Sequence, residues 1–256
     1  MNEYIYQIKN LNFAFNKKSQ LIIENANLSI KKSKLTAIVG VNGSGKSTFL
    51  KLLINFLSPL SGDIIFLNKN LKDIEQKNLS RHIAYVSQNP NENIPLTVDE
   101  VINFGNYPYE NLIFRDKPHF KENLNNALKI TRTEHLKDKL FTNLSIGEKQ
   151  KVMIARAICQ NTQVILLDEP TSSLDIKNEV EIMRMLKQFV IEKKISIILI
   201  CHNLNLISQY ADEIIFINDK KITYGTKEIL FNENNLSNIF NTNIHEITIE
   251  DKKIFY

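Results

Sequence analysis

The chain begins with segments in which apolar and polar residues alternate. Residues 4–13 and 22–30 both follow the two-residue period of a strand with one buried face, which predicts a pair of antiparallel strands. Residues 35–39 are apolar throughout and lead straight into a glycine-rich loop, so we expect a fully buried strand there. A helix is predicted to follow this loop over residues 45–55, and two short strands are predicted at 63–67 and 83–86.

The pattern changes to a helical one between residue 90 and about residue 161. Thr97 and Glu100 have the spacing of a helix N-terminal capping box, just before an apolar run. Further on, one apolar stripe recurs at helical spacing, and we interpret it as core rather than as a ligand site. Its members are Phe120, Leu124, Ala127 and Leu128.

Strand signals return at residues 164–167, 196–201 and 213–217, with helices predicted near 180–192 and 204–211. Alternation of strands and helices predicts an α/β fold with a mostly parallel sheet covered on both faces, here interrupted by the helical segment. A hairpin around residues 217–222 and a peripheral tail complete the prediction.

Composition narrows the class of protein. With 256 residues, 43% of them apolar, the chain can bury the core of one large domain. Its apolar runs are strand-sized, and its first residues lack the features of a secretory signal, so we expect a cytoplasmic protein that does not cross a bilayer alone. A net charge of +4 with scattered lysines gives no basic stripe, and no nucleic-acid partner is expected. Cys159 and Cys201 lie in apolar patterns and are expected to be buried, reduced thiols.

The loop after the strand at 35–39 matches the phosphate-binding pattern G-x-x-x-x-G-K-[ST] in its usual strand, loop, helix context. Glycines let several backbone N–H groups converge on a phosphate, and the next helix adds its positive end. Lys46 would reach the β and γ oxygens of ATP, and the Ser47 hydroxyl would bind Mg²⁺. The complete predicted ATP-binding loop is Gly40, Val41, Asn42, Gly43, Ser44, Gly45, Lys46, Ser47 and Thr48.

Two carboxylates follow the buried strand at 164–167. Asp168 is expected to hold Mg²⁺, and Glu169, one residue further on, is expected to polarise the water that attacks the γ-phosphorus. Alone, such a dipeptide would be read as a solvated strand end; beside a phosphate-binding loop it predicts ATP hydrolysis.

With these motifs in order, the chain resembles the ATP-binding-cassette ATPases along nearly its whole length. The resemblance implies a P-loop core of RecA type, with an N-terminal antiparallel β subdomain and an inserted helical subdomain. It places a domain at 1–240, with core at 1–89 and 162–225, helices at about 90–161, and a short tail at 226–256 that packs on the core.

The resemblance also assigns further residues. Gln88 matches the Q-loop glutamine, which touches Mg²⁺ or the attacking water. Residues 144–148, Leu-Ser-Ile-Gly-Glu, stand in the place of the LSGGQ signature, so Ser145 and Gly147 would contact ATP held by a second copy of the chain. Ile146 and Glu148 depart from the signature and are expected to weaken that contact.

Three more positions match less specific family motifs. Asp175 ends a D-loop-like segment, Ser172-Ser173-Leu174-Asp175, at the dimer interface, although an ordinary helix N-cap explains it nearly as well. His202 resembles the switch histidine that contacts the γ-phosphate. Phe15 matches the aromatic residue that stacks on adenine, and the alternative is a core phenylalanine.

A single cassette resembles a separately encoded importer subunit. Segments 96–108, 174–176, 202–205, 239–240 and 245–246 resemble ATPases for the uptake of iron-siderophore complexes, haem or cobalamin, and imply import of an iron chelate. The implied partners are two integral membrane permease subunits, which hold the chain at the inner face of the membrane, and an extracytoplasmic solute-binding protein. Import of another metal, of cobalamin or of another small solute remains an alternative, as do a soluble non-transport cassette ATPase and a P-loop kinase.

Overall fold

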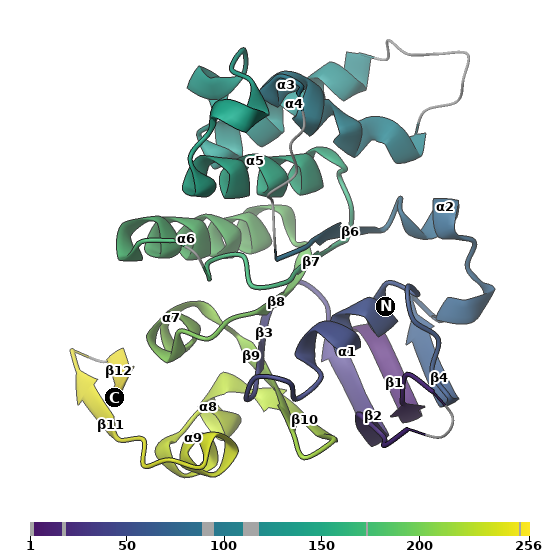
Figure 1. Ribbon diagram of the computed structural model, residues 1–256, viewed down its shortest axis with the longest axis vertical. Helices are drawn as coiled ribbons and strands as arrows, with labels where there is room; N and C mark the ends of the chain where they lie inside the picture. Colours follow the sequence, from purple (N-terminus) through teal and green to yellow (C-terminus); the bar gives the residue numbers. More distant parts are fainter. Residues whose placement is uncertain (1–2, 17–18, 89–94, 110–117, 173, 251) are drawn as a thin grey trace. The chain divides into compact units, whose positions relative to one another are not determined.

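The computed structural model describes residues 3–16, 19–88, 95–109, 118–172, 174–250 and 252–256 (Figure 1). Residue contacts divide the chain into two compact units. The first unit comprises Met1–Glu75 and Ser196–Tyr256, and the second comprises Gln76–Ile195. Each unit is described by itself below.

The first unit contains an antiparallel sheet with the strand order β2-β1-β4-β5. Most apolar residues of β1 are buried, whereas Lys9 and Asn10 are exposed, and the pairing of β1 with β2 is interrupted by register shifts. Tyr6 is fully buried and donates a hydrogen bond to the carbonyl of Leu53 over 3.0 Å, which ties this sheet to the first helix. The strands are β1 (Tyr4–Phe13), β2 (Ile23–Lys31), β4 (Ser61–Phe66) and β5 (Lys69–Asn70).

A second group of strands in this unit has β3 at its centre. Strand β3 pairs in parallel with both β8 and β9, and β10 returns antiparallel to β9 in a hairpin that places Ile222 opposite Ile217. Every residue of β3 and β8 is buried, as expected for strands covered on both faces. These strands are β3 (Leu35–Val39), β8 (Ser196–Ile200), β9 (Glu213–Asn218) and β10 (Lys221–Thr226).

Helices and a small hairpin complete the first unit. The last residues form more regular structure than the predicted tail, and Phe255 is buried with its ring edge-on to Phe231, the centroids 5.0 Å apart. The helices are α1 (Lys46–Leu53), the 3₁₀ turn Leu71–Asp73, α7 (Leu204–Tyr210), α8 (Lys227–Leu230) and α9 (Glu233–Phe240), and the hairpin strands are β11 (Glu246–Ile249) and β12 (Lys252–Phe255).

The second unit is mainly helical in its described part. Its two strands, β6 (Ile83–Val86) and β7 (Val164–Leu167), pair in parallel, and α5 packs against both α3 and α4. The helices are α2 (Gln76–Leu79), α3 (Val98–Asn103), α4 (Pro118–Thr131), α5 (Ile146–Cys159) and α6 (Ile176–Lys193), with 3₁₀ turns at Phe104–Tyr109, Glu134–Leu136 and Phe141–Asn143.

The predicted fold class is confirmed: parallel strands carry the phosphate-binding loop, antiparallel strands precede it, and helices are inserted. The capping box of Thr97 and Glu100 is present, and the predicted helical stripe is core, with Ala127 fully buried. Helix α6 begins at residue 176, four residues before the predicted start, because Asp175 caps its N-terminus.

Both cysteines are buried, and burial raises the pKa of the Cys159 thiol to about 12. In the described residues no helix combines the length and the apolarity that a membrane span requires. The predicted domain limits fall partly on residues 89 and 90, which lie outside the described residues, and stay a prediction.

Candidate functional site

The phosphate-binding loop lies between β3 and α1, and the backbone geometry explains why three of its positions are glycine. Gly43 and Gly45 have φ angles of +79° and +102°, in the left-handed region that favours glycine. A Cβ atom on Gly45 would lie 2.7 Å from Cγ2 of Ile22, and one on Gly40 would lie 2.2 Å from the carbonyl oxygen of Ile217. The tight curl of this loop therefore depends on glycine at these positions.

Lys46 is the first residue of α1, and its ammonium group turns back over the loop. Its Nζ donates hydrogen bonds of 2.9 Å to the carbonyls of Gly40 and Val41, and the side chain is only 6% exposed. A positive charge is thus held in the loop, at a helix end whose first turn carries no acidic residue. Both features favour an anion at this point.

Ser44 supplies an independent test of whether a phosphate group fits here. Its Oγ is buried, yet it has no hydrogen-bond partner among the residues that the structure describes. A buried hydroxyl without a hydrogen-bond partner costs about 1–3 kcal/mol of stability. A ligand oxygen that accepted a hydrogen bond from it would therefore stabilise the loop. The residues present fit the phosphate chain of a nucleotide. Ser47, the predicted Mg²⁺ ligand, is half-buried on the first turn of α1.

The acidic pair follows β7 in the second unit. Asp168 is 6% exposed, and its backbone N–H donates to the carbonyl of Val86 over 2.9 Å. The Tyr85 hydroxyl donates to Oδ2 of Asp168 over 3.2 Å. Burial, and then the negative charge of Asp168, raise the pKa of Tyr85.

Tyr85 is a residue that sequence reasoning missed. It lies within β6, and in the sequence it cannot be distinguished from an aromatic residue that only packs in a buried strand. The only signal in the sequence is its place three positions before Gln88. In the structure its strand, β6, pairs with β7, which leads to Asp168.

Glu169 and Gln88 are brought together. The Gln88 side chain donates a hydrogen bond of 2.6 Å from Nε2 to Oε2 of Glu169. Glu169 itself has a φ of +50°, an uncommon backbone conformation for a residue with a side chain. The sequence had assigned catalytic roles to both residues, and the structure places their side chains in direct contact.

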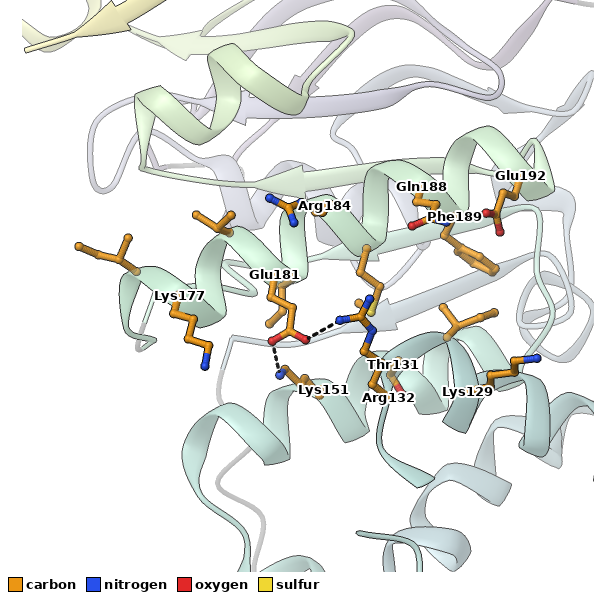
Figure 2. A pocket seen from close by; sticks show the side chains of 15 residues that line it. Lys129, Thr131, Arg132, Lys151, Lys177, Glu181, Arg184, Gln188, Phe189 and Glu192 are labelled. Atoms are coloured by element: carbon orange, nitrogen blue, oxygen red, sulfur yellow. Dashed lines mark hydrogen bonds and ion pairs between the residues drawn. The ribbon is translucent and has the colours of Figure 1, made fainter. Parts of the chain in front are cut away.

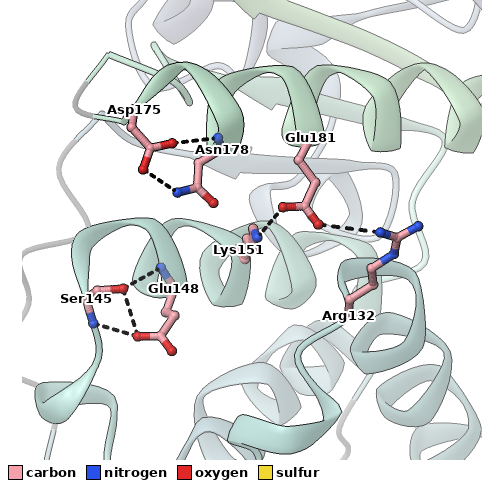
Figure 3. Close-up of polar contacts among 7 residues, drawn as sticks. All are labelled: Arg132, Ser145, Glu148, Lys151, Asp175, Asn178 and Glu181. Carbon is pink, nitrogen blue, oxygen red and sulfur yellow. Dashed lines mark hydrogen bonds and ion pairs between the residues drawn. The ribbon is translucent and has the colours of Figure 1, made fainter.

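The Ser145 segment forms the N-terminus of α5. Ser145 is the N-cap, and Glu148 closes a capping box with it: the Ser145 hydroxyl and backbone N–H each donate to Oε2 of Glu148 over 2.8 Å (Figure 3). These hydrogen bonds lower the pKa of the Glu148 carboxyl, in spite of slight desolvation. Glu148 therefore has a local structural role that sequence reasoning missed, although its spacing from Ser145 repeats that of Thr97 and Glu100. Ile146 beside them is 51% exposed.

Gly147 is not required by the packing of its own chain. A Cβ atom there would meet nothing closer than 3.5 Å, the Nδ2 atom of Asn178. Asp175 accepts hydrogen bonds from the backbone N–H and the side chain of that same Asn178, over 2.8 and 3.0 Å (Figure 3). The N-cap interpretation of Asp175 is thus confirmed, while its interface role is not tested. Ser173 of the same segment lies outside the described residues.

Phe15 and His202 belong to the first unit. Phe15 lies beyond the end of β1, is 64% exposed and stands edge-on to Phe13, with ring centroids 5.4 Å apart. The alternative that Phe15 is a core residue is therefore wrong, and its ring is accessible for stacking. His202 follows β8 and is exposed.

The predicted site residues are thus divided between the two units. The first unit carries Phe15, the loop 40–48 and His202. The second unit carries Gln88, Ser145, Gly147, Asp168, Glu169 and Asp175.

Comparison with known proteins agrees with this set of motifs. Residues 23–172, more than half of the chain, match the ABC transporter family. The chain is 33% identical over 224 residues to YusV of Bacillus subtilis, an ATP-binding protein assigned to a siderophore transport system; the match covers 87% of this chain and 82% of YusV.

Solved structures show the same likeness. An inward-facing ABC transporter matches with a TM-score of 0.85 and 25% identity, over 99% of this chain and 96% of the other. The dimeric ATP-binding cassette MJ0796, in a post-hydrolysis state with ADP and phosphate, matches with a TM-score of 0.74 and 27% identity, over 86% and 98%.

The family match covers most of the chain, and it includes both the phosphate-binding loop and the acidic pair Asp168 and Glu169. The chain therefore belongs to the ABC transporter family, in which it is an ATPase that binds and hydrolyses ATP.

Proposed function

We propose that this ATPase energises the import of an iron chelate, such as an iron-siderophore or haem-like complex, across the cytoplasmic membrane. The observation that carries the proposal is the similarity to the siderophore-transport protein YusV over 87% of the chain. The inward-facing transporter that matches over 99% of the chain is assigned to the metal-chelate type, which supports the same class of cargo.

The nucleotide would be bound by the loop 40–48, with Phe15 stacked on the adenine. Lys46 places its positive charge in this loop, and the Ser44 hydroxyl, which has no partner in the described residues, can donate a hydrogen bond to a phosphate oxygen there. We assign the Mg²⁺ ligands to Ser47, Asp168 and Gln88, either directly or through water. When bound, Mg²⁺ neutralises the charge that develops on the phosphate oxygens.

Glu169 is proposed to polarise the attacking water, and His202 to orient it. The hydrogen bond from Gln88 holds the Glu169 carboxylate in one orientation, which is what a base needs before it accepts a proton. Tyr85 holds the neighbouring Asp168 in the same way, so the two carboxylates of the pair are positioned by different residues.

A second copy of the chain is proposed to complete each ATP site through Ser145, Gly147 and Asp175. The matched MJ0796 cassette is a dimer bound to ADP and phosphate, which supports this arrangement. Ser145 and Gly147 lie at the N-terminus of α5, where exposed N–H groups and the helix dipole favour a phosphate. A Cβ atom at Gly147 would make only ordinary van der Waals contacts, so a role of this glycine toward a ligand on the partner is consistent with its surroundings.

We further propose that the dimer lies on the inner face of the membrane, bound to two integral membrane permease subunits that receive cargo from an extracytoplasmic binding protein. Residues 88–106, of which 89–94 lie outside the described residues, would contribute to the permease contact; within this range Phe104 is 53% exposed.

The test is uptake of a radioactive ferric siderophore by cells that lack this chain and receive either the wild type or Glu169→Gln. We expect wild type to restore uptake and Glu169→Gln not to, while both copurify with the membrane subunits. Cobalamin, a haem and a free divalent metal should be measured in parallel. If uptake of cobalamin or of the free divalent metal depends on the chain, and uptake of neither the ferric siderophore nor haem does, the cargo assignment is wrong. Copurification without any membrane protein would instead favour a soluble, non-transport ATPase.

A further inference from the structure

A long groove lies on the second unit; none of the site residues assigned above lines it, although it begins next to Asp175. It follows α6 from Ile176 to Glu192 and is bounded on the other side by the end of α4 and by Lys151 of α5 (Figure 2). Its volume is about 880 Å³. At 1.5 Å per residue, the stretch of α6 that lines it is about 24 Å long.

The groove combines an apolar wall with an excess of positive charge. Its apolar members include Ile176, which is 79% exposed. The other apolar residues of the lining are Ile130, Val180, Ile182, Met185 and Phe189. Five basic side chains, Lys129, Arg132, Lys151, Lys177 and Arg184, stand against two acidic ones, Glu181 and Glu192.

The centre of the groove is already neutralised. An oxygen of the Glu181 carboxylate lies 2.7 Å from Nζ of Lys151, and the other lies 3.7 Å from a guanidinium nitrogen of Arg132 (Figures 2 and 3). The hydrogen bond from Lys151 lowers the pKa of this carboxyl most, and the charges of Lys151, Arg132 and, least, Lys177 lower it further. Glu181 thus occupies the place where a compact anion such as free phosphate would bind.

The remaining basic side chains are spread along the groove. Lys129, Lys177 and Arg184 form no ion pair with any residue in the described ranges, and Figure 2 shows Lys129 and Lys177 at opposite ends, with Glu181 between them. An occupant that pairs with them must carry several negative groups at separated points and an apolar surface between these groups.

We propose that this groove binds an amphipathic helix of a partner protein, with acidic residues along one edge and apolar residues facing α6. A helix of about 16 residues spans 24 Å, and a groove between helices is a common receptor for such a segment. Acidic residues of the partner helix pair with Lys129 and Lys177 at its two ends, while its apolar face covers Ile176 and Val180.

The experiment measures the binding of a fluorescent synthetic peptide of about 18 residues, designed as a helix with glutamates on one edge and leucines on the opposite face. The full-length chain is titrated into it, and anisotropy gives Kd. We expect binding that weakens as salt rises, because exposed charges are screened. A peptide with lysine in place of each glutamate should bind at least ten-fold more weakly, since like charges repel.

Two matched variants locate the site. Lys129→Gln with Lys177→Gln should weaken binding about five-fold, since each exposed ion pair contributes a modest amount. Lys77→Gln with Lys121→Gln removes the same charge from exposed helical positions of the same unit outside the groove, and should leave Kd unchanged. Val180→Thr, which keeps size and charge, should weaken binding about two-fold through the lost apolar contact.

The proposal is overturned if the wild type does not bind the acidic peptide, or if both double variants bind it equally well. It is also overturned if the wild type binds vesicles of anionic phospholipid but not the peptide, because the groove would then be a membrane contact. Thermal unfolding of each variant shows whether it is folded, and ATPase activity should be unchanged in all of them, so failure here leaves the proposed transport function untouched.

Discussion

Gly147→Ala separates what the chain needs for folding from what ATP hydrolysis needs. The added Cβ would meet three atoms at 3.5 to 3.6 Å, which is ordinary van der Waals contact, and Gly147 does not have a positive φ. Alanine also favours a helix over glycine by up to about 1 kcal/mol. We therefore expect the variant to unfold at the same temperature as the wild type or a few degrees higher.

Turnover should respond in the opposite direction. If the N-terminus of α5 closes on the γ-phosphate bound by the partner, a methyl group at Gly147 would keep the backbone N–H away from its acceptor. Loss of one donor of this kind typically lowers kcat by about 10²- to 10³-fold. Release of phosphate at saturating ATP measures kcat, and binding of a fluorescent ATP analogue to the monomer should be unchanged, because the loop 40–48 is intact.

Gly105→Ala is the matched control. There the Cβ would lie 2.4 Å from the carbonyl oxygen of Arg156, so alanine should destabilise the fold by about 1–3 kcal/mol through overpacking. A Gly147→Ala protein that is stable and hydrolyses ATP at the wild-type rate would refute the proposed contact across the dimer. A variant that is strongly destabilised would instead show that the packing argument is wrong.

Three further predictions follow from the contacts of the acidic pair and the α5 capping box. Tyr85→Phe should remain folded but need several-fold more Mg²⁺ for half-maximal binding of the ATP analogue, because Asp168 loses the donor that orients it; unchanged Mg²⁺ dependence would contradict this role. Glu169→Gln should bind ATP normally and lose about 10²- to 10⁴-fold in turnover, and a wild-type rate would exclude it as the base. Glu148→Gln tests the capping box by urea unfolding at several pH values. The folded-state pKa of Glu148 is lowered, so its contribution is complete above the unfolded value of about 4.3 and disappears as pH falls through the folded value; a difference from wild type that persisted in acid would contradict this assignment.

The capping box also changes how the departure from the family signature is understood. Glu148 was expected to bring unfavourable charge toward a nucleotide, but its carboxylate is held by the Ser145 hydroxyl and backbone N–H. In this structure the Ser145 hydroxyl is thus already engaged, and it would have to exchange this acceptor for a phosphate oxygen when a dimer closes. Ile146, exposed beside it, remains the departure that the fold does not explain.

The sequence by itself determined the elements whose signals are local. Loop 40–48 could be recognised because backbone curvature, a helix end and a lysine are specified by adjacent residues. The strand before it, the Thr97 capping box and the buried stripe on α4 were predictable for the same reason, since hydrophobic period and cap chemistry depend on neighbours in the chain.

Only the tertiary structure decided which side chains meet across the sequence. Tyr85 reaches Asp168 and Gln88 reaches Glu169 because β6 and β7 pair in parallel, and no local pattern encodes that register. The α6 groove likewise exists because the end of α4 and Lys151 of α5 face one side of a helix that is far away in sequence. The conformation of a segment depends mainly on residues that are neighbours in the chain. The contacts that its side chains make depend on packing between segments that are far apart in the sequence.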